Sequence, residues 1–142
     1  CRRDTIAEGH KHFLFPVSLL LIVTLTACVS PEPQTRGADI YSKHCTSCHG
    51  QTALGDGPRS ADLGVQPANL TLLSKRNGGT FPIEEVMAQI HGYSGRHQFG
   101  AMPEFGQDLA GPMVDWVAKS GEVIPTPKGL IDLAAYLEGI QK

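Results

Sequence analysis

The stretch "KHCTSCHG", from Lys43 to Gly50, places two cysteines two residues apart and a histidine directly after the second cysteine. A Cys-x-x-Cys spacing carries specific chemistry, so this stretch constrains the fold more than any other part of the chain. Three interpretations of the CTSCH motif at 45–49 are open: a redox-active dithiol, half of a zinc site, or an attachment point for haem. The remaining sequence is needed to choose among them.

Two of these interpretations find little support in the neighbouring sequence. A thioredoxin-like dithiol is typical of a helix that follows a buried strand, whereas this motif follows a predicted helix and precedes a loop. A structural zinc site needs about four ligands, usually from a second pair of cysteines or histidines. Of the four cysteines, Cys1 and Cys28 lie in an amino-terminal segment, so His91 and His97 would have to complete such a site.

The third interpretation explains the whole motif, because C-x-x-C-H is the haem c attachment pattern. Thiols at positions i and i+3 can reach the two vinyl groups on one edge of a porphyrin and form thioethers. The imidazole that follows is then carried over the ring and can ligate the iron. We therefore predict that Cys45, Cys48 and His49 hold one haem c, with His49 as a metal ligand.

The amino terminus has the layout of an export signal. Basic residues precede an apolar run, Phe13–Ala27, which is short for a membrane span of about 20 residues. The run ends in "LTAC", Leu25 to Cys28, which resembles the lipobox of bacterial lipoproteins, where the cysteine is acylated and becomes the first mature residue. The resemblance implies export to the periplasmic side of a bacterial membrane and a lipid anchor on Cys28. A short anchor or an ordinary cleavage site is the alternative.

Three segments follow from this interpretation. We expect a signal peptide at 1–27, the acylated cysteine with a flexible tether at 28–36, and a folded domain at 37–142. Pro31 and Pro33 among polar residues favour an extended tether. The net charge of −2 and the pI of about 6.3 leave no basic stripe to neutralise phosphates, so nucleic acid is not an expected partner.

The folded domain is predicted to be all-α with long loops. Apolar periodicity and end signals indicate helices at 37–44, 82–91 and 126–141, and a helical turn at 114–119. Thr126 is expected to cap the last helix and Pro127 to open it. Glycines and prolines interrupt residues 51–69 and 93–111, which are expected to be loops, and no strand alternation is visible.

A second axial ligand is expected on the other face of the iron, and methionine sulfur is one common choice. Met102 is preferred because it lies in the constrained loop "FGAMPEFG". Met87 falls on the apolar stripe of the helix at 82–91 and is expected in the core, whereas Met113 stays possible. His97 is the main competitor, and His44 is expected to face solvent.

With these residues, the stretch 37–142 resembles a class I c-type cytochrome in a monohaem, bacterial lipoprotein form. The likeness is carried by a helix ahead of the motif, the C-x-x-C-H motif, the Met102-Pro103 pair, and "AYL" in the last helix. It implies a small all-α globule of a few helices and long loops wrapped around one covalent haem. It also implies a close crossing of the first and last helices, with Gly37 against Tyr136.

The same resemblance implies that a proline carbonyl accepts a hydrogen bond from the other ring nitrogen of the ligand histidine. Pro58 is preferred for this role, and Pro67 is the alternative. The inserted stretch "ANLTLLSKRNGGTF" departs from the smallest members of the family, and the exposure of the haem edge depends on it.

The function implied is single-electron transfer, without catalytic residues, to membrane-bound or periplasmic redox proteins. Iron ligated by both His49 and Met102 has no open position for a substrate, so a carrier rather than an enzyme is expected. One alternative is a haem enzyme or gas-binding sensor with a labile sixth ligand, beside Glu104 and His97. Another is a cytochrome subunit of a larger oxidoreductase, with Trp116 on a docking surface.

Overall fold

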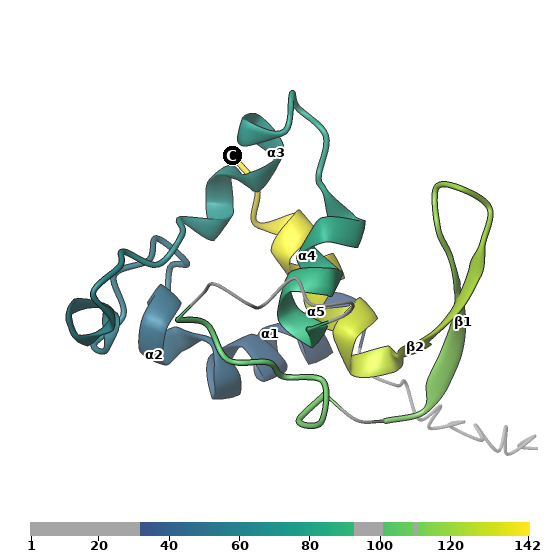
Figure 1. Ribbon diagram of the computed structural model, residues 1–142, viewed down its shortest axis with the longest axis horizontal. Helices are drawn as coiled ribbons and strands as arrows, with labels where there is room; N and C mark the ends of the chain where they lie inside the picture. The colour runs from purple at the N-terminus through teal and green to yellow at the C-terminus, as the bar shows by residue number, and fades with distance from the viewer. Residues whose placement is uncertain (1–31, 93–100, 110) are drawn as a thin grey trace, which may run out of the picture.

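The computed structural model describes residues 32–92, 101–109 and 111–142. Most regular elements are helical, and they surround a single core (Figure 1). In chain order they are α1 (Pro33–His44), α2 (Thr46–His49), the 3-10 turns η1 (Ser60–Leu63) and η2 (Leu70–Leu72), α3 (Leu73–Arg76), α4 (Ile83–His91), the strands β1 (Met113–Val117) and β2 (Val123–Pro127), and α5 (Lys128–Gly139). The prediction of a small, essentially all-α globule is confirmed.

The close crossing of α1 and α5 organises the molecule. A Cβ atom added to Gly37 would overlap the carbonyl oxygen of Asp132 and lie 2.6 Å from the Cβ of Tyr136. Only glycine permits this approach, so the predicted crossing is confirmed. The ring of Tyr41, one turn further along α1, then packs on Tyr136 with 5.3 Å between ring centroids.

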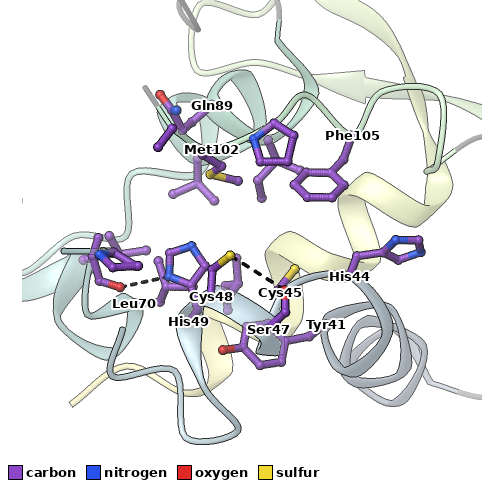
Figure 2. Close-up of a pocket in the computed structure, with 18 of the residues that line it drawn as sticks. Tyr41, His44, Cys45, Ser47, Cys48, His49, Leu70, Gln89, Met102 and Phe105 are labelled. Carbon is purple, nitrogen blue, oxygen red and sulfur yellow. Dashed lines mark hydrogen bonds between the residues drawn. The ribbon is translucent and has the colours of Figure 1, made fainter. Parts of the chain in front are cut away.

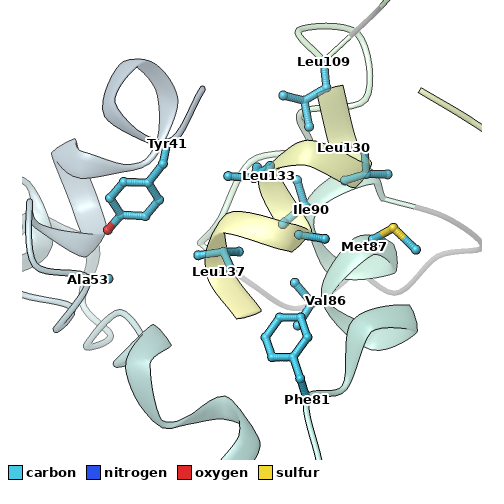
Figure 3. Packing of buried hydrophobic residues seen from close by; sticks show 11 residues of the cluster. Tyr41, Ala53, Phe81, Val86, Met87, Ile90, Leu109, Leu130, Leu133 and Leu137 are labelled. Carbon is cyan, nitrogen blue, oxygen red and sulfur yellow. The ribbon is translucent and has the colours of Figure 1, made fainter. Parts of the chain in front are cut away.

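The core lies between α4 and α5 (Figure 3). Val86, Met87 and Ile90 are buried on one stripe of α4, as the periodicity predicts, and they face the buried leucines of α5. Gly92 ends α4 in the left-handed conformation, with φ of 86°. Each fully buried side chain of this size contributes about 1.5–3 kcal/mol, so this layer is a main source of stability. The placement of Met87 in the core is confirmed.

The first helix begins earlier than expected. α1 starts at Pro33, so residues 33–36, which the sequence placed in an extended tether, are helical. Proline is well suited to the first helical position because its missing N–H would have no partner there. Arg36 then reaches Asp132 on α5, with 2.7 Å between Nε and Oδ2. The first described helix therefore begins four residues before the predicted start of the folded domain at residue 37.

Residues 114–119 do not form the expected helical turn. They belong to an antiparallel hairpin in which Trp116 pairs with Ile124 and Val117 with Val123. Along β1, partly buried and exposed side chains alternate, because Val114 and Trp116 turn inward. This alternation is only five residues long, too short to stand out in the sequence.

The start of α5 also differs from the prediction. Thr126 belongs to β2, and its hydroxyl donates a hydrogen bond to the carbonyl of Ile124 at 2.9 Å instead of capping the helix. Pro127 occupies the N-cap position, and the helix begins at Lys128. Among the described residues, no helix has the length and apolar character needed to cross a bilayer.

Candidate functional site

A cavity of about 860 Å³ lies between α2 on one side and α4 with the segment 101–105 on the other (Figure 2). Its volume falls within the range of roughly 300–1,000 Å³ that is typical of ligand and cofactor sites. The lining is mostly apolar and draws on α1, α2, the chain between α2 and α3, α3, α4 and α5. The CTSCH motif forms one wall of this cavity.

The short helix α2 gathers the motif. Its single turn is closed by a hydrogen bond from the backbone N–H of His49 to the carbonyl of Cys45, at 2.9 Å. Cys45, Cys48 and His49 consequently all line the cavity on the same side (Figure 2). The hydroxyl of Tyr41 donates to the carbonyl of Gly50 at 2.6 Å and so ties the end of α2 to α1.

The ring of His49 is held by one hydrogen bond. Its Nδ1 lies 3.0 Å from the carbonyl oxygen of Ala68, and because a carbonyl can only accept, Nδ1 carries the proton. Burial lowers the pKa of His49, although the Ala68 carbonyl acts in the opposite direction. The ring is therefore neutral at physiological pH, with an unprotonated Nε2 that can bind a metal.

The acceptor of this hydrogen bond corrects the sequence analysis, which preferred Pro58. Pro58 is exposed and does not line the cavity. Its neighbours Gly57 and Arg59 donate their N–H groups to the carbonyls of α2, which holds this part of the loop along the backbone of α2. Pro67 lines the cavity, but the carbonyl that His49 reaches is that of the next residue, Ala68.

The two cysteine thiols are partly buried and unpaired. Burial, with Cys48 as a second cause, raises the pKa of Cys45 to about 12. Within the described ranges, no cluster of three or more His, Cys, Asp or Glu side chains is suited to a metal ion. His97, one of the residues that a zinc site would need, lies outside those ranges.

Met102 lies across the cavity from the motif (Figure 2). All three methionines are described, and Met102 is the one that lines the cavity, since Met87 is in the core and Met113 is 57% exposed on β1. The segment around Met102 is anchored by a hydrogen bond from the N–H of Phe105 to the carbonyl of Ile90, at 2.9 Å. The structure thus brings together the predicted residues Cys45, Cys48, His49 and Met102.

The cavity is also lined by residues that were not predicted to belong to it, three of which stand out. His44, expected to face solvent, is partly buried and meets Phe105 edge to face, with 6.1 Å between ring centroids. Leu70 and Leu73 come from the inserted stretch, which folds into η2 and α3 and closes one wall. Leu70 and Leu73 are one helical turn apart, and this spacing is the feature of the sequence that could have predicted a helical wall here.

The site fits haem c on its own chemistry. Two thiols lie beside an imidazole whose Nε2 is unprotonated, and a thioether faces them across an apolar space of suitable volume. Glu104, which the enzyme alternative invoked, is exposed and does not line the cavity. Trp116 packs against the core from the hairpin and does not line the cavity either.

Comparison with known proteins agrees with this geometry. A family model described as cytochrome c oxidase, cbb3-type, subunit III matches residues 32–119, more than half of the chain. The matched range begins one residue before α1 and includes the motif, the Ala68 acceptor and Met102. No curated protein matches the chain in a sequence search.

Proposed function

This chain belongs to the c-type cytochrome family described as cytochrome c oxidase, cbb3-type, subunit III, and we propose that it is a single-electron carrier in which His49 and Met102 ligate the haem iron. As a member of this family it binds haem c covalently and takes part in haem-based electron transfer. Haem c supplies a one-electron ferric/ferrous couple when bound. The observation that carries the ligand proposal is the position of Met102, alone among the methionines, opposite His49 across the cavity.

Several residues of the cavity have distinct roles in this proposal. Cys45 and Cys48 attach the cofactor through thioethers, and His49 presents Nε2 to the iron. The carbonyl of Ala68 orients the imidazole and raises its basicity. Met102 closes the opposite side, and the apolar side chains of Leu70, Val86 and Phe105 are among those that exclude water. Burial and a thioether ligand both favour a high reduction potential.

The carrier proposal requires an iron that offers no free position to small molecules. Carbon monoxide added to the reduced protein, and cyanide added to the oxidised protein, should bind slowly or weakly at neutral pH. Rapid and tight binding of either would instead support the enzyme or sensor alternative. Covalent attachment is tested in the same preparation by a pyridine haemochrome spectrum and an intact mass, which should reveal one haem per chain.

We also propose that the protein is a lipoprotein held on the periplasmic side of a membrane through Cys28. Because α1 begins at Pro33, only four residues separate Cys28 from the helix. At about 3.5 Å per residue, such a tether spans at most about 17 Å. The haem domain would then stay beside the membrane, which raises its effective concentration near membrane-bound redox partners.

The anchor is tested by fractionating cells that express the full chain. The wild-type protein should be found in the membrane fraction with a mass that includes acyl groups, and Cys28→Ser should move it to the soluble fraction. A wild-type protein that is soluble and unacylated would contradict the anchor, and the electron-carrier proposal would be unaffected.

A second candidate function is that of a subunit in a larger oxidoreductase. The family description names an oxidase subunit, and the hairpin offers an exposed apolar face formed by Met113, Val117 and Val123. Purification of the native protein in mild detergent distinguishes an oxidoreductase subunit from a free electron carrier. A stable complex that retains the cytochrome through size exclusion supports the subunit, and release as a monomer supports the free carrier.

A further inference from the structure

The wall of the cavity that contains Leu70 and Leu73 is held from outside by one side chain, that of Gln141. Its Nε2 donates to the carbonyl of Leu70 at 2.7 Å, and its Oε1 accepts from the N–H of Ser74 at 2.9 Å. The same Nε2 donates to the carbonyl of Leu137 on α5, at 2.6 Å. Gln141 therefore connects the end of α5 to both ends of the segment 70–74.

Backbone contacts reinforce this connection. The N–H of Lys142 donates to the carbonyl of Thr71 at 3.0 Å, and the N–H of Leu70 donates to the carbonyl of Ala53 at 2.8 Å. Thr71 is 3% exposed, and its own N–H and hydroxyl both donate to the Asn69 side chain. The segment is thus a tightly bonded unit with few alternative arrangements.

This unit continues directly into the acceptor of the His49 hydrogen bond. Ala68 precedes Leu70 by two residues, and its carbonyl lies 3.0 Å from Nδ1 of His49. The carbonyl of Leu70 is held by Gln141, so the chain between the two carbonyls has little freedom to move. A shift of the wall would change the length and angle of the Ala68–His49 hydrogen bond.

We propose that Gln141 is a positioning residue for the iron ligand: by holding Leu70 and Ser74, it sets the strength of the hydrogen bond from His49 to Ala68 and thereby the reduction potential. The inference rests on the proposed role of His49 as an axial ligand. A strong hydrogen bond at Nδ1 makes the imidazole more basic and favours the ferric state. Loss of the Gln141 contacts weakens that bond and raises the potential.

The test uses the full-length, haem-loaded protein with three variants. Gln141→Ala removes all three side-chain hydrogen bonds, and Gln141→Met removes the same three bonds while keeping an uncharged side chain of similar length. Lys142→Ala is the matched control, because the contact of Lys142 with Thr71 is made by the backbone. Two quantities are measured: the midpoint reduction potential and the exchange rate of the His49 Nδ1 proton by NMR.

We expect a positive shift of the potential and at least several-fold faster proton exchange in both Gln141→Ala and Gln141→Met, and wild-type values in Lys142→Ala. An unchanged or lower potential in a fully loaded, folded Gln141→Ala protein overturns the inference. If that variant does not fold, the same criterion applies to Gln141→Met. Absence of haem from the wild-type protein would refute the proposed function itself, which is a separate and distinguishable outcome.

Discussion

Arg36 and Asp132 form an ion pair across the crossing of α1 and α5, with 2.7 Å between Nε and Oδ2. Asp132 is 2% exposed and also accepts a hydrogen bond from Lys128, at 2.7 Å. Burial alone would raise the pKa of Asp132, but the hydrogen bonds from Arg36 and Lys128 together outweigh it, so the pKa lies below its ordinary value. The carboxylate is therefore charged in the folded protein at neutral pH.

Because the pKa of Asp132 is lowered, we predict that acid reduces the free energy of unfolding through this residue. The stability that Asp132 contributes is fully present above the carboxyl pKa of the unfolded chain and is lost as the pH falls through the lower pKa of the folded state. Asp132→Asn should therefore be less stable than the wild type at pH 7, and the difference should shrink towards pH 3. Denaturant titrations between pH 7 and pH 3 measure this difference in stability. Asp39→Asn is the control, because Asp39 is exposed. A difference that does not depend on pH would contradict the assignment.

Substitution of Gly37 tests the helix crossing. In Gly37→Ala the added Cβ meets the Asp132 carbonyl and the Cβ of Tyr136, so α1 and α5 must move apart. Overpacking of this kind costs about 1–3 kcal/mol in the free energy of unfolding. Urea denaturation is the measurement, and Gly111→Ala is the control because no atom lies within 4 Å of its added Cβ. Equal stability of the two variants would argue against the close crossing.

The hydroxyl of Tyr41 offers a test of how α2 is held. Tyr41→Phe keeps the ring contact with Tyr136 but removes the shorter of two hydrogen bonds to the buried carbonyl of Gly50, which still accepts from the N–H of Ala53 at 3.3 Å. Loss of one hydrogen bond to an acceptor that keeps another donor costs about 0.5–1.5 kcal/mol, which thermal unfolding should detect. The control, Tyr136→Phe, keeps the same ring contact and leaves the Gly50 hydrogen bond intact. A Tyr41→Phe protein as stable as this control would show that the hydrogen bond contributes little.

Replacement of the facing methionine tests the second axial ligand. Met102→Ala should abolish the weak near-infrared absorption band of thioether–iron coordination. It should also lower the reduction potential by an amount on the order of tenths of a volt, since axial ligands set potentials over a span of about 0.8 V. Met113→Ala is the control because Met113 is exposed on β1, away from the cavity. Survival of the band in Met102→Ala, together with its loss in Met113→Ala, would show that Met113 is the ligand. Absence of the band from the wild-type protein would instead point to His97.

Several features could be predicted because they depend on local spacing. The C-x-x-C-H motif needs one helical turn to bring its side chains together, and α2 supplies it. The stripe on α4 is a property of nine consecutive residues, and Gly92 ends that helix by its own backbone freedom. The position of Met102 in a constrained loop was predicted from its immediate neighbours. The candidate attachment residues and the principal helices therefore follow from short stretches of sequence.

Other features depend on contacts between distant residues, which local spacing does not report. The hairpin of β1 and β2 exists because two short strands satisfy each other's backbone groups, and α1 is extended by the contact of Arg36 with Asp132, 96 residues away. Likewise, Ala68, the acceptor for His49, lies 19 residues further along the chain, and the neighbouring segment of η2 and α3 is hydrogen-bonded to the end of α5 through Gln141. The sequence by itself determined which residues are the candidates to hold the cofactor. Only the tertiary structure decided which carbonyl orients the histidine and which residues line the cavity. The physical reason is that these contacts depend on loop closure and on hydrogen bonds between distant residues, and several carbonyls and apolar residues in the loops are equally suitable by sequence alone.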